Sequence, residues 1–143
     1  MHDLGELIRR AGRTAGLEVQ SEFRVPLSSG AAGEIDWVWL KNGTVVAAFE
    51  IEGSNAARNS LQADYAKFEA LAGCIKVVAL YSVTSQLKAK KLPPRELLPI
   101  TRVEQKWPEL GMPGVQVLLD TELMGPGGIK AIREKAAGFG RAG

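Results

Sequence analysis

Two residue types that build many small active sites are nearly absent from this sequence. Its 143 residues include one cysteine, Cys74, and one histidine, His2. A single cysteine excludes a disulfide within the chain, and a metal site built on thiolates or imidazoles would need more ligands than the chain offers. Cys74 lies in an apolar stretch, which favours packing over nucleophilic catalysis. This composition fits a reducing compartment, and we expect a cytoplasmic protein.

Long apolar runs and a strong excess of one charge are also missing. No stretch approaches the roughly 20 apolar residues that cross a bilayer, so we expect neither a membrane-spanning nor a secreted protein. The chain has 18 Lys and Arg against 16 Asp and Glu, a formal net charge of +2. That balance permits a polyanionic partner without requiring one. Basic clusters at Arg9, Arg10 and Arg13 and at 88–91 are interpreted first as solvated faces.

What is present is the composition of an ordinary globular domain. Apolar residues make up 45% and charged residues 24% of the sequence. A chain of 143 residues can bury a core without disulfide bonds. Because we find no internal repeat and no long linker, we predict a single domain over 1–143. Its core would cover about 4–82, with a C-terminal elaboration over 83–143.

Apolar spacing predicts the first two elements of the chain. A helix is predicted over about 4–15, with Asp3 and Glu6 as a capping box and Gly16 as the stop signal. Period-two alternation then predicts a strand over 17–25. Its apolar face would comprise Val19, Phe23 and Val25.

A hairpin is predicted next. The segments 35–40 and 44–51 are rich in β-branched and apolar residues, and Asn42 and Gly43 between them tolerate the positive φ of a tight turn. The two strands would therefore be antiparallel neighbours.

The rest of the chain predicts a crossover and a mixed sheet. A helix is predicted to begin after Gly53-Ser54-Asn55 and to run to about Ala72, followed by an apolar strand over 75–81. A helical crossover implies that this strand pairs in parallel with the previous one. Further predictions are a short helix over 84–91, a strand over 115–119 and a last helix over 129–136. The predicted fold is α/β, with an α-β-β-β-α-β order and one mixed central sheet flanked by helices.

Acidic residues interrupt two of these apolar strands. Asp36 lies on the second strand, and Glu50 and Glu52 lie on one face of the third. The hairpin brings Asp36 near Glu50, so three like charges would share a partly buried place and would need a cation or raised pKa values. Oxygen ligands without histidine or cysteine favour a hard ion, Mg²⁺ or alternatively Mn²⁺. Such an ion can activate water for attack on a phosphate.

A structural role is the competing interpretation of these acids. Glu50 and Glu52 would then lie on the exposed face of an edge strand, paired with cations such as Lys67 or Arg58. The flanking apolar runs and the helix that follows favour a central strand instead. Alternation puts Glu34 on the same face of the second strand as the site, where we expect a solvated neighbour.

The order of elements and the acids on the hairpin resemble the PD-(D/E)XK nuclease superfamily, the restriction-endonuclease-like fold. In that family an acidic residue on the second strand is followed by E-x-K or E-x-E on the third, and the segments 33–36 and 48–52 match this pattern. The resemblance covers about residues 4–82. It implies that Asp36 and Glu50 bind the metal together with the backbone carbonyl of Ile51.

The same resemblance assigns a role to Glu52, which stands where the family usually has lysine. E-x-E variants occur among active restriction enzymes, and Glu52 would be a second metal ligand or a general base for the water. The missing positive charge would come from Lys67 or Arg58 on the following helix, although helix geometry places Lys67 rather far away.

Two more residues are similar to those of particular branches of the superfamily. Glu6 corresponds to a first-helix glutamate of archaeal Holliday-junction resolvases, and its other interpretation is the capping box. Gln62 and Tyr65 resemble the Gln…Tyr motif of RecB-family nucleases at an interval one residue shorter. Tyr65 also falls on the apolar stripe of its helix and fits a core position.

The resemblance implies a Mg²⁺-dependent DNA endonuclease that hydrolyses phosphodiester bonds with activated water. The expected substrate is duplex or branched DNA, and a homodimer is expected because one site cuts one strand. Basic residues of the first helix and of 88–91 would contact phosphates. The alternative is a nuclease-like module that binds nucleic acid or protein without catalysis, which the missing lysine supports. RNA cleavage is a third possibility.

Overall fold

One five-stranded mixed sheet organises the protein. The structure is a computed structural model that describes residues 3–52, 58–81 and 114–139. The strands follow one another across the sheet in chain order, antiparallel from the first to the third and parallel from the third to the fifth. They are β1 (Glu18–Pro26), β2 (Ala32–Lys41), β3 (Thr44–Glu52), β4 (Ile75–Leu80) and β5 (Val115–Leu119).

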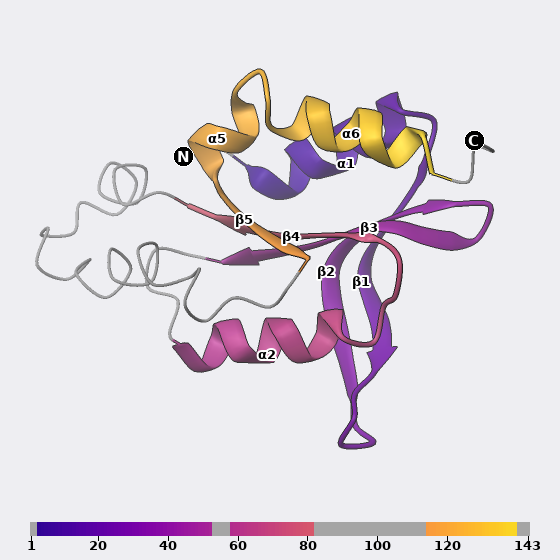
Figure 1. Ribbon diagram of the computed structural model, residues 1–143, viewed down its shortest axis with the longest axis vertical. Coiled ribbons are helices and arrows are strands. Elements are labelled where there is room, and N and C mark those ends of the chain that lie inside the picture. Colours follow the sequence, from indigo (N-terminus) through magenta and orange to yellow (C-terminus); the bar gives the residue numbers. More distant parts are fainter. Residues whose placement is uncertain (1–2, 53–57, 82–113, 140–143) are drawn as a thin grey trace, which may run out of the picture.

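Helices cover both faces of the sheet, as Figure 1 shows. One face carries α1 (Leu4–Thr14), α5 (Asp120–Met124) and α6 (Ile129–Ala137), and the other carries α2 (Arg58–Phe68). The predicted α/β class with a mixed sheet flanked by helices is confirmed. So are the α-β-β-β-α-β order and the central position of β3. The short helix expected over 84–91, the basic cluster within it and the helix start at 53–55 lie outside the described residues.

A large, mainly aliphatic core lies between the sheet and the helices α1 and α6. Leu4 and Ile8 of α1 pack there with Ile132 of α6, beside Trp39 and Phe49 of the sheet. The indole Nε1 of Trp39 donates a buried hydrogen bond to the Ile8 carbonyl, 3.0 Å away. The first and last described helices therefore pack side by side over the same core (Figure 1).

The ends of α1 follow the sequence signals. The Asp3 carboxylate accepts a hydrogen bond from the Glu6 main-chain N–H at 3.1 Å, which satisfies one of the free N–H groups of the first turn. Gly16 has a φ of +78°, a conformation that glycine adopts without strain. This helix was therefore predicted correctly at both ends.

The hairpin between β2 and β3 forms at the predicted turn but contains a bulge. Asn42 and Gly43 both have positive φ, 53° and 79°. Trp39 pairs with Ala47 but Leu40 pairs with Val45, so Val46 is an extra residue on β3. Strict alternation from Glu50 would place Val46 on the face that bears Glu50 and Glu52, but with the bulge Val46 packs in the core under α1 and α6.

In the middle of β1, and again in the middle of β2, the apolar side chains change from one face of the sheet to the other. Val19 packs toward α1 and α6, whereas Phe23 and Val25 pack toward α2, so the single apolar face predicted for this strand is wrong. Glu22, between them, has a φ of +51°, which breaks the period-two pattern. The neighbouring strand does the same around Asp36, because Ile35 and Val38 pack on the α2 side and Trp37 on the other.

The crossover through α2 is parallel, as predicted, but the helix is shorter than predicted. It ends at Phe68 rather than near Ala72. After Glu69, the amides bond to carbonyls three residues back, Ala70 to Lys67 and Leu71 to Phe68, which tightens the chain before Gly73 at φ +71°.

The C-terminal segment adds to the same sheet. The strand over 115–119 is confirmed as β5, and the last helix is confirmed as α6. The short helix α5 between them was not predicted. Lys41 at the end of β2 fixes α6, because its Nζ donates to the carbonyls of Ala137 (3.0 Å) and Phe139 (2.7 Å). No helix in the described part of the chain is long and apolar enough to cross a membrane.

The contact between α1 and the sheet predicts the effect of Gly12→Ala. A Cβ at Gly12 would lie 2.5 Å from Trp39 Nε1 and 2.7 Å from Val19 Cγ2. Although alanine is normally the better helix former, we expect the substitution to lower the free energy of unfolding by about 1–3 kcal/mol, because the core is overpacked. Urea unfolding measures this. Gly127→Ala, with open space around it, is the control, and a stabilised Gly12→Ala variant would contradict the packing described.

Candidate functional site

The main-chain pairing of β2 with β3 ends at Trp37 and Phe49. Two carboxylates connect the strands there. The Asp36 main-chain N–H donates to Oε1 of Glu50 at 3.1 Å, and the Ile51 main-chain N–H donates to Oδ2 of Asp36 at 2.8 Å. Side chains thus replace the main-chain acceptors of a regular ladder. The hairpin brings Asp36 to Glu50 as the sequence predicts.

Three carboxylates gather on the α2 face beside this connection. Glu50 and Glu52 come from β3, and Asp64 comes from α2. One oxygen of each lies within 4.8 Å of the others. Glu50 and Asp64 are both 2% exposed, and Glu52 is half-buried. The site therefore concentrates acidic groups in a place with little water.

Burial and mutual repulsion favour the protonated forms of these acids. Burial raises the pKa of Glu50, and the negative charge of Asp36 raises it further. Burial also raises the pKa of Asp64. Hydrogen bonds with Glu52 and Glu50 and repulsion from their charges raise it further, to about 11. Asp64 therefore carries a proton at neutral pH when no cation is bound, and it can donate that proton to Glu52 or Glu50.

Lys67 supplies a positive charge to the same cluster. Its Nζ lies 3.3 Å from Oε2 of Glu50. Partial burial lowers the pKa of Lys67, but the charge and hydrogen bond of Glu50, together with the charges of Asp64 and Asp36, outweigh burial and raise the pKa. The expectation that Lys67 is distant is wrong, because its stem lies against β2 and a Cβ built on Gly33 would be 3.2 Å from its Cγ. The edge-strand interpretation is also wrong, although its pairing with Lys67 occurs.

The donor set fits a hard divalent cation. Every available ligand in the cluster is a carboxylate oxygen, which Mg²⁺, Mn²⁺ and Ca²⁺ prefer. Oδ2 of Asp64 is buried, and no N–H or O–H group of another described residue donates to it. A cation could replace the proton that Asp64 shares with Glu52 or Glu50 and satisfy these oxygens.

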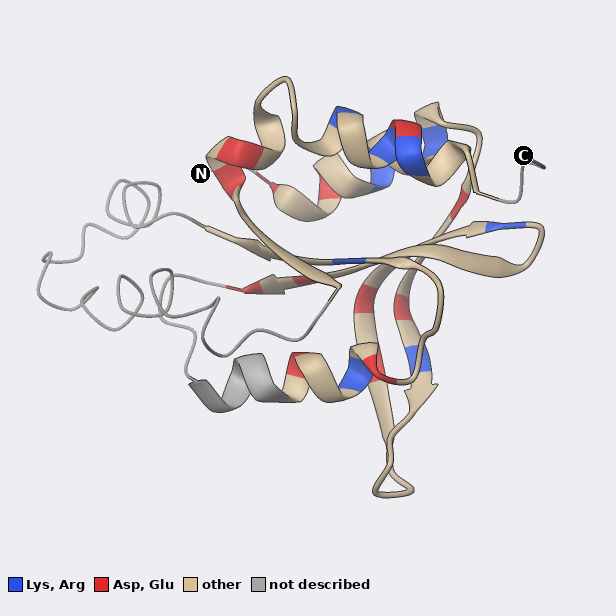
Figure 2. Ribbon diagram, viewed as in Figure 1, with Lys and Arg blue, Asp and Glu red and all other residues tan. Residues whose placement is uncertain are grey.

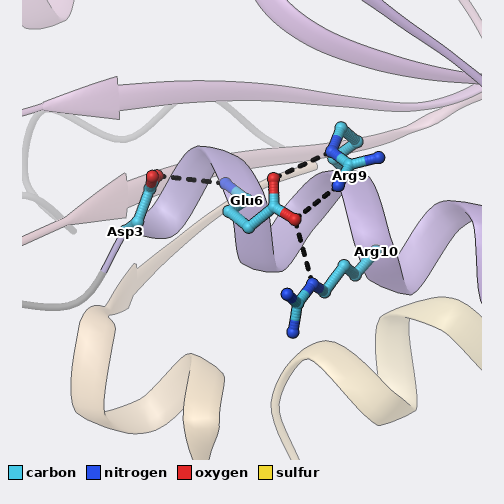
Figure 3. Close-up of polar contacts among 4 residues, drawn as sticks. All are labelled: Asp3, Glu6, Arg9 and Arg10. Atoms are coloured by element: carbon cyan, nitrogen blue, oxygen red, sulfur yellow. Dashed lines mark hydrogen bonds and ion pairs between the residues drawn. The ribbon is translucent and has the colours of Figure 1, made fainter.

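Glu6 is not brought to this cluster. It lies on α1, on the other face of the sheet, where its carboxylate pairs with Arg9 and Arg10 (Figure 3). The hydrogen bond with Arg9 lowers the pKa of Glu6 to about 2, and Arg10 contributes. Of the two hydrogen bonds of the expected capping box, the one from the Glu6 main-chain N–H to Asp3 forms. The Glu6 side chain binds Arg9 and Arg10 instead of turning back to the Asp3 main chain.

The remaining predicted residues have different outcomes. Gln62 lies within α2, but its side chain, like that of Arg58, is outside the described residues. Ile51 is held next to the cluster by its N–H bond to Asp36. Tyr65 is 9% exposed and packs in the core beneath α2, as its place on the apolar stripe predicts. The Glu34 side chain is exposed, as expected for a solvated neighbour.

Sequence reasoning missed Asp64. A signal for it was present, because Asp64 lies four residues before Phe68 and three after Leu61, on the stripe that helical spacing assigns to the core. A charged residue at a core position of a helix that packs over acidic strand residues indicates a buried partner.

Basic residues gather elsewhere. Figure 2 shows Lys and Arg along α6 and on the neighbouring α1, on the face opposite α2. The described residues of this surface are Arg9, Arg10, Arg13, Lys130, Arg133 and Lys135. The acidic cluster and this basic surface are thus separated by the thickness of the sheet.

No protein-family model, curated protein or solved structure matches this chain. The likeness to PD-(D/E)XK nucleases stays a prediction made from the sequence. Functional proposals for the chain therefore depend on its own residues and their geometry.

The raised pKa of Asp64 predicts how the stability of Asp64→Asn varies with pH. Above the ordinary pKa of 3.8, the unfolded chain releases a proton that the folded protein retains, so the free energy of unfolding falls as pH rises toward about 11. Asparagine has no such proton. We expect the melting temperature of Asp64→Asn, relative to the unsubstituted protein, to increase from about pH 5 to about pH 8. A difference that is constant with pH would contradict a protonated Asp64.

The ion pair predicts that Lys67→Met destabilises the fold. Removal of the ammonium leaves Glu50 buried without its charged partner, which costs about 1–3 kcal/mol in free energy of unfolding. Urea unfolding at neutral pH measures the loss. Lys130→Met, which removes an exposed lysine from α6, should change stability little. Equal effects of the two substitutions would show that the Lys67–Glu50 pair is unimportant.

Proposed function

We propose that the protein is a Mg²⁺-dependent DNA endonuclease that hydrolyses phosphodiester bonds. The observation that carries the proposal is the gathering of Glu50, Glu52 and Asp64 within 4.8 Å, beside Asp36 and Lys67. Buried like charges destabilise a protein unless they are compensated, so their concentration at one place indicates a functional site. The order of elements around the hairpin supports the nuclease resemblance.

The chain's own groups have distinct roles in this proposal. Glu50 is the central cation ligand, and the resemblance adds Asp36 and the Ile51 carbonyl. When bound, the cation would lower the pKa of a water and stabilise charge on the phosphate. Glu52 is close enough to Glu50 to be a further ligand or to accept the proton of the attacking water.

Lys67 compensates for the missing lysine of the E-x-K pattern. It reaches Glu50 from α2 rather than from β3. An ammonium beside the cluster can orient a phosphate oxygen or stabilise the negative charge that develops during hydrolysis. The E-x-E sequence therefore does not deprive the site of a cation.

Duplex or branched DNA as the substrate and a homodimer as the working form follow from the family resemblance. In support of a polyanionic partner, α1 and α6 carry basic residues (Figure 2). They lie on the opposite face of the sheet from the acidic cluster, and Glu6 pairs with two of them, so they would contact phosphates away from the cleavage site.

One observation favours the second candidate, a nuclease-like module without catalysis. Lys67 and the proton on Asp64 together reduce the charge of the cluster, so the acids can be accommodated without a metal. Such a protein would bind nucleic acid or another protein and cleave nothing.

Cleavage assays with Glu50→Gln separate the two. The purified protein is incubated with supercoiled plasmid, single-stranded DNA, a four-way junction and RNA in Mg²⁺ or Mn²⁺. We expect metal-dependent cleavage of DNA, lowered at least about a hundredfold in Glu50→Gln, because loss of a group that stabilises transition-state charge has effects of this size. Glu34→Gln, an exposed acid on the same hairpin, should retain activity. Cleavage of none of the substrates would reject the endonuclease, and cleavage of RNA alone would reassign the substrate.

A further inference from the structure

Asp64 is a buried acidic residue that lies beside two other acidic residues. Its side chain projects from α2 toward β3, close to Glu50 and Glu52, and the residue is 2% exposed. No N–H or O–H group of another described residue donates to Oδ2 of Asp64. The carboxyl group instead lies against the carboxylates of Glu50 and Glu52, an arrangement of buried oxygens that needs a shared proton or a cation to be stable. The position therefore indicates a ligand that the cluster is built to receive.

We propose that Asp64 is a cation ligand, and that Glu50, Glu52 and Asp64 bind one divalent cation between β3 and α2. This set differs from the one that the family resemblance implies, in which Asp36 and the Ile51 carbonyl join Glu50. The inference deepens the proposed endonuclease, on which its catalytic meaning rests.

The hydrogen bonds of Asp36 give it a different role. Its Oδ2 accepts from the Ile51 N–H at 2.8 Å, and its own N–H donates to Oε1 of Glu50. Asp36 is thus a positioning residue, which holds Glu50 toward α2 and connects the two strands. Asparagine at this position retains an oxygen for the Ile51 N–H, so Asp36→Asn preserves the connection.

The spacing of the oxygens is close to that around a hard cation. Ligand oxygens lie about 2.3–2.6 Å from Ca²⁺ and about 2.0–2.1 Å from Mg²⁺. The three oxygens, within 4.8 Å of one another, would reach these distances from one ion by small side-chain movements. Because the ligands come from two elements, the bound cation would also join α2 to the centre of the sheet.

Calorimetric titration with MnCl₂ and CaCl₂, without nucleic acid, tests the proposal. The full chain is compared with Asp64→Asn, Asp36→Asn and Glu69→Gln, which removes an exposed charge just beyond α2. We expect one cation per chain, bound at least about tenfold more weakly by Asp64→Asn, the scale of losses at metal sites. Asp36→Asn should weaken binding less than Asp64→Asn does, and Glu69→Gln should match the unsubstituted chain.

Two results would overturn the proposal: no cation binding by the unsubstituted chain, or a loss in Asp36→Asn that equals or exceeds the loss in Asp64→Asn. Circular dichroism checks that each variant is folded. A different result would reject the proposed endonuclease. Cation binding that depends on Asp64 without any cleavage leaves this site in place and rejects the catalytic role.

Discussion

The candidate site depends on one constraint: the main-chain pairing of β2 with β3 stops at Trp37 and Phe49. Up to the Trp37–Phe49 pair, main-chain groups satisfy each other across the ladder. Beyond it, the Glu50 and Asp36 carboxylates accept the freed N–H groups of Asp36 and Ile51. Buried main-chain donors need partners, so these acids have a structural reason to be where they are. The same bonds fix the direction in which Glu50 points, toward α2 and its acidic and basic residues.

Compensation of charge explains how such a cluster survives in a folded protein. Lys67 is paired with Glu50, and Asp64 retains a proton. Both devices come from α2, so the helix carries the groups that neutralise the strand acids. Neither removes the energetic cost of burying these acids entirely, because burial still raises the pKa of Glu50. A site held in this condition is less stable than an apolar core would be, which is common where function needs poorly solvated charge.

Regular parts of the fold were predictable because their sequence patterns are local. The turn at Asn42-Gly43 and the alternation of residues 47–52 fixed the hairpin and the shared face of Glu50 and Glu52. Alternation failed where the backbone departs from a regular strand, at Glu22 and at the bulge residue Val46. A positive φ at a glutamate has no clear sequence signature.

The candidate site was predictable only in its strand residues. Asp36 and Glu50 were placed together by the hairpin alone. Asp64 and Lys67 depend on how α2 lies across the sheet, a tertiary arrangement that helical spacing does not supply. A helix face can be recognised from sequence, but the strand residue that it meets cannot. Lys67 was judged too distant for this reason.

The packing of α6 beside α1 has a consequence for the order of events during synthesis. Leu4 and Ile8 share their core with Ile132, so the apolar face of α1 stays partly uncovered until 129–137 have left the ribosome. Lys41 likewise finds its acceptors only when Ala137 has arrived. The hairpin and α2 can assemble earlier, because their contacts are closer in the chain. Nascent chains of this protein would thus carry the acidic cluster before the layer that closes the opposite face.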